Sequence, residues 1–161
     1  MRLRLLATAG LAVGLVAPAV AQEKATACDG PRDACQQIVA LARTYDAAFD
    51  SHDVAGVAGL FTEDAVWMPE GPAQSGRGAI EKFLAGLFKA GLSNEVLNVR
   101  EAHVAGDTAW AVGDWRNSGP GPNQTTQQYH GNWGAVYARA GDGWKVRMLT
   151  TNLIESEAAG R

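Results

Sequence analysis

Residues 95–117 read EVLNVREAHVAGDTAWAVGDWRN, and their apolar and polar side chains alternate with a period close to two on both sides of Ala105-Gly106-Asp107. This pattern is typical of two half-buried strands joined by a tight turn. It continues over residues 126–154, with a second Gly-Asp turn at 140–143. The sequence therefore predicts four consecutive antiparallel strands, at 95–104, 108–117, 126–139 and 144–154.

The stretch before residue 91 has a helical period instead. Its apolar side chains predict a long amphipathic helix at 35–51, and Asp53 can cap a short second helix at 54–61. A short strand at 65–68 and a third helix at 79–90 complete this half. Helices followed by a run of strands indicate an α+β fold, in which three N-terminal helices pack on one face of a curved antiparallel sheet.

Length and composition fit a single globular domain. The 161 residues are 47% hydrophobic and 19% charged, a mixture too apolar for a disordered chain. A net charge of −3 argues against a nucleic-acid-binding surface. The three histidines are scattered and no phosphate- or dinucleotide-binding motif occurs, so the sequence predicts neither a metal nor a cofactor.

The N-terminal segment, MRLRLLATAGLAVGLVAPAVA at residues 1–21, has the order of a secretory signal peptide. Arg2 and Arg4 precede an apolar stretch at 5–16, and Ala19-Val20-Ala21 matches a cleavage site. We expect export to the periplasm or the exterior, with a mature chain that begins at Gln22 and has a net charge of −5. No membrane anchor is expected after cleavage, since no later stretch is long and apolar enough to span a bilayer.

The two cysteines, Cys28 and Cys35, are separated by a loop that contains Gly30 and Pro31 and can turn tightly. In an oxidising compartment they predict a local disulfide that ties the N-terminal arm to the first helix. Zinc is the poorer interpretation, because it usually takes four ligands.

Four segments together resemble a known superfamily. They are YDAAFDSHD at residues 45–53, LFTEDAV at 60–66, SGRGAI at 75–80 and DGWKV at 142–146. Their order and spacing resemble the SnoaL-like and ketosteroid-isomerase-like bacterial members of the nuclear transport factor 2-like superfamily, whose fold is also called cystatin-like. The resemblance implies a cone-shaped sheet over three helices, an internal pocket and a homodimer.

On this basis we expect a signal peptide at 1–21, a flexible arm at 22–34, the cone domain at 35–155 and a polar tail at 156–161.

The pocket of such a cone would be apolar with a few placed polar groups. Of the five tryptophans, Trp67 and Trp133 are the candidates to line it, together with Tyr137. Alternation in the last strand places Met148, Thr150 and Asn152 on the same wall. The alternative is that these aromatic side chains are ordinary core.

The resemblance to ketosteroid isomerase implies a hydrogen-bond-donating tyrosine at Tyr45, but the isomerase base would fall near Pro69 and its second acid near Ala135. A steroid isomerase with that mechanism is therefore not expected. Asp114 is the candidate base if it points into the cone; the alternative is a solvated position on the convex face, since a shift of one residue reverses its direction. His130 is expected to face outward.

Two functional hypotheses follow. The first is an exported protein that binds a hydrophobic ring compound and, if catalytic, moves a proton on it without a cofactor, by isomerisation, cyclisation or dehydration. The second is a non-catalytic assembly or interaction module whose cone is filled by its own side chains. The polar groups Tyr45, Thr150 and Asn152 favour the first, because a sealed apolar core would not accommodate them at low cost.

Overall fold

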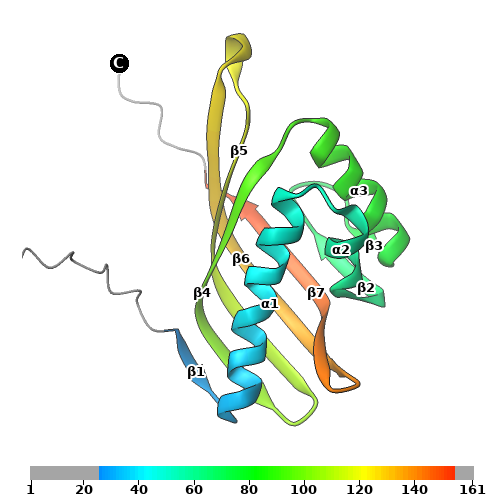
Figure 1. Ribbon diagram of the computed structural model, residues 1–161, viewed down its shortest axis with the longest axis vertical. Coiled ribbons are helices and arrows are strands. Elements are labelled where there is room, and N and C mark those ends of the chain that lie inside the picture. The colour runs from blue at the N-terminus through cyan, green and yellow to red at the C-terminus, as the bar shows by residue number, and fades with distance from the viewer. Residues whose placement is uncertain (1–25, 155–161) are drawn as a thin grey trace, which may run out of the picture.

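A computed structural model describes residues 26–154 as helices packed on one face of a curved seven-stranded sheet (Figure 1). The predicted signal peptide at 1–21 and the polar tail at 156–161 lie outside the described residues. The elements in chain order are β1 (Ala27–Asp29), α1 (Arg32–Asp50), α2 (Val54–Gly59), β2 (Phe61–Met68), β3 (Gln74–Ser75), α3 (Arg77–Lys89), β4 (Ser93–Ala105), β5 (Thr108–Pro120), the 3-10 turn η1 (Pro122–Gln124), β6 (Thr126–Ala140) and β7 (Gly143–Leu153).

The predicted meander is confirmed, because β4, β5, β6 and β7 pair with their chain neighbours in antiparallel fashion. The sheet as a whole is mixed, which corrects the expectation of a wholly antiparallel one. Its order is β1-β4-β5-β6-β7-β2-β3, in which β2 pairs parallel with β7 and β1 pairs parallel with β4. Long connections through α3 and α1 allow these parallel pairings.

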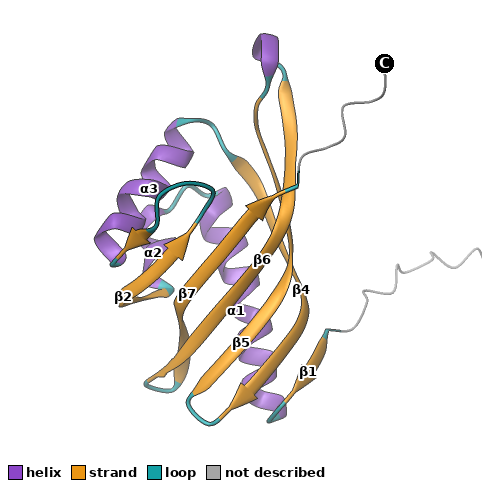
Figure 2. Cartoon of the chain, turned by 180° about the vertical axis from the view of Figure 1, so that it is seen from behind, coloured by secondary structure: helices purple, strands orange, loops and turns teal. Residues whose placement is uncertain are grey.

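The helices cover the concave face of the sheet. Helix α1 begins at Arg32, earlier than predicted, and presents a buried stripe that includes Ile38, Ala42, Tyr45 and Phe49. Asp53 caps α2 as expected, since its carboxylate accepts the Gly56 N–H at 2.8 Å. The opposite face of the sheet is open in Figure 2, where no helix of the described residues lies over it.

The Cys28–Cys35 disulfide is present, with the two Cα atoms 6.0 Å apart, and it joins β1 to the first turn of α1. Strand β1 is too short to have been read from a hydrophobic period. It is held on β4 by backbone pairing and by a hydrogen bond from the Thr26 hydroxyl to the Val99 carbonyl at 3.0 Å.

None of the helices within residues 26–154 combines the length and the apolar character needed to cross a membrane.

Candidate functional site

The helices and the concave face of the sheet enclose a cavity of about 340 Å³. Its wall is dominated by aromatic rings that come from α1, α3 and three strands, β2, β5 and β6. These rings are Tyr45, Phe49, Phe61, Trp67, Phe83, Trp115, Tyr129, Trp133 and Tyr137. Exposed Glu70, Pro120 and Asn152 also line it, so the cavity reaches the surface between the end of β7 and the β5–β6 hairpin.

Trp115 and Trp133 lie over glycines of the neighbouring strand. Gly131 is paired with Trp115, and Gly113 with Trp133, across β5 and β6. A Cβ atom at Gly113 would lie 2.9 Å from the Trp133 Nε1, and one at Gly131 would lie 2.8 Å from the Trp115 Nε1. A Cβ would also lie 1.8 Å from the Asn98 main-chain oxygen at Gly113 and 1.7 Å from that of Asn152 at Gly131, so each position requires glycine. The indoles of Trp115 and Trp133 form an apolar floor.

The indole nitrogens of this floor are already engaged. The Trp133 Nε1–H donates to the main-chain oxygen of Asp114 at 3.1 Å, and the Trp115 Nε1–H donates to that of Asn152 at 3.2 Å. A ligand in the cavity would therefore meet the faces of these rings and find its polar partners elsewhere.

The buried carboxyl group in the cavity wall is that of Glu95, which is only 6% exposed. Its Oε2 accepts a hydrogen bond from the Asn117 Nδ2 at 2.8 Å, and the other polar atom of that amide, Oδ1, is buried without a partner. A register shift in β4 between Ser93 and Val96, with Asn94 in the left-handed region at φ 56°, places Glu95 beside Asn117.

Burial raises the pKa of Glu95 to about 7, although the Asn117 hydrogen bond opposes the shift; the charges of Asp46 and Asp50 raise the pKa further. Burial likewise raises the pKa of Asp46 to about 6. Both aspartates are held by the backbone of β4, since Asp50 accepts the Glu95 N–H at 2.8 Å and Asp46 accepts the Leu97 N–H at 3.0 Å. Helix α1 thus places two carboxylates behind the cavity carboxyl.

Two buried phenols, Tyr45 and Tyr137, also belong to the wall. Burial raises the pKa of Tyr45 well above its ordinary value and also raises the pKa of Tyr137, so both are protonated at neutral pH. Neither hydroxyl forms a hydrogen bond within residues 26–154. Both are therefore available as donors to a ligand.

Several predicted site residues do line the cavity. Tyr45, Trp67, Trp133 and Tyr137 are all in its wall, and Asn152 lies at its rim. The prediction is wrong for Met148 and Thr150. A register shift opposite Val136 and Tyr137 inserts one residue into β7, so that Leu149 and Thr151 point inward in their place.

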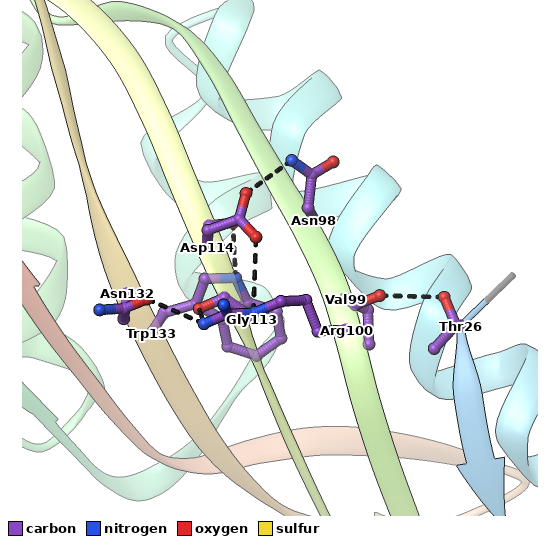
Figure 3. Close-up of polar contacts among 8 residues, drawn as sticks. All are labelled: Thr26, Asn98, Val99, Arg100, Gly113, Asp114, Asn132 and Trp133. Carbon is purple, nitrogen blue, oxygen red and sulfur yellow. Dashed lines mark hydrogen bonds and ion pairs between the residues drawn. The ribbon is translucent and has the colours of Figure 1, made fainter. Parts of the chain in front are cut away.

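Asp114 lies on the outer face of the sheet, which is the alternative left open for it, so its candidate role as a base inside the cone is wrong. Gly113 and Trp115 face inward, and the residue between them must face outward. Figure 3 shows its carboxylate accepting a hydrogen bond from the Asn98 Nδ2 at 2.8 Å and lying 3.5 Å from the Arg100 Nε. Its partner is thus Arg100. His130 is exposed, as expected.

Sequence reasoning missed Glu95 and Asn117, the buried polar pair of the site. Residue 95 was read as the first residue of a strand, where a glutamate is usually solvated. The available signal was Asn94, because asparagine is enriched at left-handed positions and can mark a bulge. The described residues contain no group of three or more His, Cys, Asp or Glu side chains that could hold a metal.

Comparison with known proteins places this geometry in a family. The sequence profile of the SnoaL-like domain matches residues 41–148. No curated protein matches the sequence. A ketosteroid isomerase-like protein from Erwinia carotovora atroseptica SCRI1043 has a similar structure, with a TM-score of 0.70 and 18% identity over 78% of this chain and 100% of that chain.

Two proteins from Novosphingobium aromaticivorans DSM are also similar in structure. One, an NTF2-like protein with a cystatin-like fold, has a TM-score of 0.66 and 22% identity over 79% of this chain and 86% of that chain. The other, named as a candidate aromatic ring hydroxylase, has a TM-score of 0.68 and 24% identity over 80% of this chain and 94% of that chain. At these identities the likeness shows the α+β cystatin-like fold, which is compatible with a cone that binds a small molecule. The chain therefore belongs to the SnoaL-like domain family of the nuclear transport factor 2-like superfamily.

Proposed function

We propose that this chain binds an apolar ring compound in its cone and, as a cofactor-free enzyme, moves a proton on it. The observation that carries the proposal is Glu95, a buried carboxyl group in a cavity of aromatic rings, whose pKa of about 7 suits a base at neutral pH. This residue takes the role that the sequence assigned to Asp114. It also supplies the base that the isomerase pattern lacks near Pro69.

In the proposed reaction, the ionised Glu95 removes a proton from a carbon of the ring. The C–H electron pair moves into the ring system, and negative charge develops on an oxygen of the substrate. The Tyr45 hydroxyl donates a hydrogen bond to that oxygen. Returning the proton to another carbon completes an isomerisation. In a cyclisation the carbanion instead forms a bond to a carbonyl carbon of the same substrate, and the proton held by Glu95 passes to the resulting alkoxide. In a dehydration a hydroxyl group on the neighbouring carbon leaves and takes that proton as water. The Asn117 amide holds the Glu95 carboxyl in place.

The test uses 5-nitrobenzisoxazole, a planar probe whose ring C–H is removed by a base while its N–O bond breaks and a coloured cyanophenolate forms. We expect kcat/KM to rise with pH around a midpoint near 7, because the ionised form of Glu95 is the base. Glu95→Gln removes the carboxyl group and should lower kcat/KM by about 100-fold or more. The matched control, Asp114→Asn, removes a carboxylate from the outer face and should leave kcat/KM unchanged. A Glu95→Gln rate equal to the wild-type rate would contradict the base assignment.

Export and self-association belong to the same proposal. The signal-like segment at 1–21 and the Cys28–Cys35 disulfide support a periplasmic or secreted location. The open face of the sheet exposes Trp110 and Val112 at 38% each, which supports a homodimer through that face.

The alternative, an assembly module with a filled cone, predicts an interior occupied by the protein's own side chains. A cavity of about 340 Å³ counts against it.

A further inference from the structure

The charged groups that line the cavity or stand directly behind Glu95 are negative. Among residues 26–154, the ionisable side chains of its wall, apart from tyrosines, are Glu95 in the interior and Glu70 at the rim, and no lysine, arginine or histidine of this part of the chain lines it. Asp46 and Asp50 stand behind Glu95, close enough for their charges to act on it. Arg116 lies near enough to Asp46 to lower the pKa of that group, but it is exposed and is not part of the wall.

The interior end of the cavity is also rich in hydrogen-bond acceptors. The Glu95 carboxylate accepts from Asn117, and the Oδ1 of that amide is a buried acceptor with no partner. Reversing the amide would bring its oxygen against the carboxylate, so the ionised Glu95 fixes the orientation in which Oδ1 is left over. A ligand that satisfies this end of the cavity must donate hydrogen bonds to it.

The remaining walls present the faces of aromatic rings. The two indoles over Gly113 and Gly131 have their nitrogens engaged in the sheet, so their apolar, electron-rich faces are what they offer. Such faces attract cations, and most strongly where water is excluded.

From these three observations we infer that the ligand is a ring compound bearing a protonated amine, with its ring on the Trp115–Trp133 floor and its ammonium group between Glu95 and Asn117. The inference rests on the binding half of the proposed function and names its substrate class.

Electrostatics separates the possible ligands. A carboxylate or phosphate would enter a cavity whose described lining has negative groups and no positive one to pair with it. A neutral ligand would leave the ionised Glu95 buried without a counter-charge, which is costly. An ammonium group supplies both the charge and the donors. It also lowers the pKa of Glu95 and keeps that carboxyl ionised, so the substrate prepares the base that acts on it.

Three probes of matched shape test this by isothermal titration calorimetry on the mature protein. They are tyramine, which is a cation, 4-propylphenol, which is neutral, and 3-(4-hydroxyphenyl)propanoate, which is an anion. We expect tyramine to bind at least about tenfold more tightly than 4-propylphenol at pH 8, and the anion to bind most weakly. Between pH 8 and pH 6 tyramine should lose about tenfold in affinity, because about one tenth of Glu95 remains ionised at pH 6.

Two variants locate the effect. Glu95→Gln should remove the preference for tyramine and leave 4-propylphenol bound, which also serves as the check that the cavity is intact. Asp114→Asn removes the same charge from the outer face and should keep the preference. Equal or tighter binding of 4-propylphenol by the wild type, or a tyramine preference that survives in Glu95→Gln, would overturn the inference and leave the proposed function standing. Failure of all three probes to bind would overturn both.

Discussion

Burial of Glu95 has two opposing effects. It raises the pKa of the carboxyl group into the range of a base at neutral pH, and it makes the ionised carboxylate destabilise the folded state. Its pKa rises from 4.5 to about 7 on folding, so the native state holds a proton that the unfolded chain releases between these values. The stability associated with protonated Glu95 is fully present below pH 4.5 and is lost as the pH rises through 7. Asp46, with its pKa raised to about 6, contributes in the same direction.

The Glu95→Gln variant should therefore be more stable than the wild type in mild alkali. At pH 8 we expect a gain of about 2–3 kcal/mol in the free energy of unfolding, and at pH 4.5 almost none, because Gln retains the uncharged shape. Urea unfolding at the two pH values measures both. A variant that is less stable than the wild type at pH 8 would mean that the carboxylate is stabilised where it lies.

At the scale of elements, the four strands of the meander and the direction of most of their side chains followed from the sequence, whereas β1 and β3 were not predicted and β2 begins at Phe61 and not at residue 65. Alternation assigned β6 correctly, and Trp133 and Tyr137 face the cavity as predicted. The two failures in β7 and the omission of Glu95 coincide with register shifts. One inserted residue reverses the direction of every side chain that follows it in the strand. The alternation of apolar and polar residues in the sequence does not show where such an insertion occurs.

Asp114 is a different case. Alternation leaves both directions open for it, because a shift of one residue reverses the direction of the side chain. The regular pairing of β5 with β6 along its whole length places it on the outer face. The disulfide, by contrast, needed only two cysteines and a short loop, and it is confirmed.

The close contact between β6 and the end of β7 makes a sharp prediction for two glycines of one strand. A Cβ at Gly131 would lie 1.7 Å from the Asn152 carbonyl oxygen, whereas one at Gly134 would lie 3.6 Å from its nearest neighbour, the Thr150 Cγ2. Gly131→Ala should cost about 2–3 kcal/mol, since the strands must separate, and should weaken binding of ring probes by displacing Trp115. Gly134→Ala, the matched control, should be tolerated.

Thermal unfolding of the two variants decides the matter. Equal midpoints for Gly131→Ala and Gly134→Ala would show that the indole floor does not depend on the glycine beneath it.

At the scale of the whole molecule, the two faces of the sheet have opposite surroundings. Helices cover the concave face and leave the cavity between, while the convex face exposes Trp110, Val112 and Met68 at 38% each (Figures 1 and 2). The same face contains the Asp114–Arg100 pair, so it offers both signs of charge to a second copy. We propose that a second copy of this chain covers the face; stable dimer interfaces bury about 1,200–2,000 Å².

Native mass spectrometry of protein isolated from the periplasm tests the assembly and the export together. We expect a dimer whose denatured subunit begins at Gln22 and lacks two hydrogens, as the disulfide requires.

Val112→Glu should give a monomer, because facing carboxylates would be buried at the centre of the interface. Ala85→Glu, at an exposed position of α3, should remain a dimer. A monomeric wild type would contradict self-association through the convex face. A subunit that still begins at Met1 would contradict export through a cleaved signal peptide.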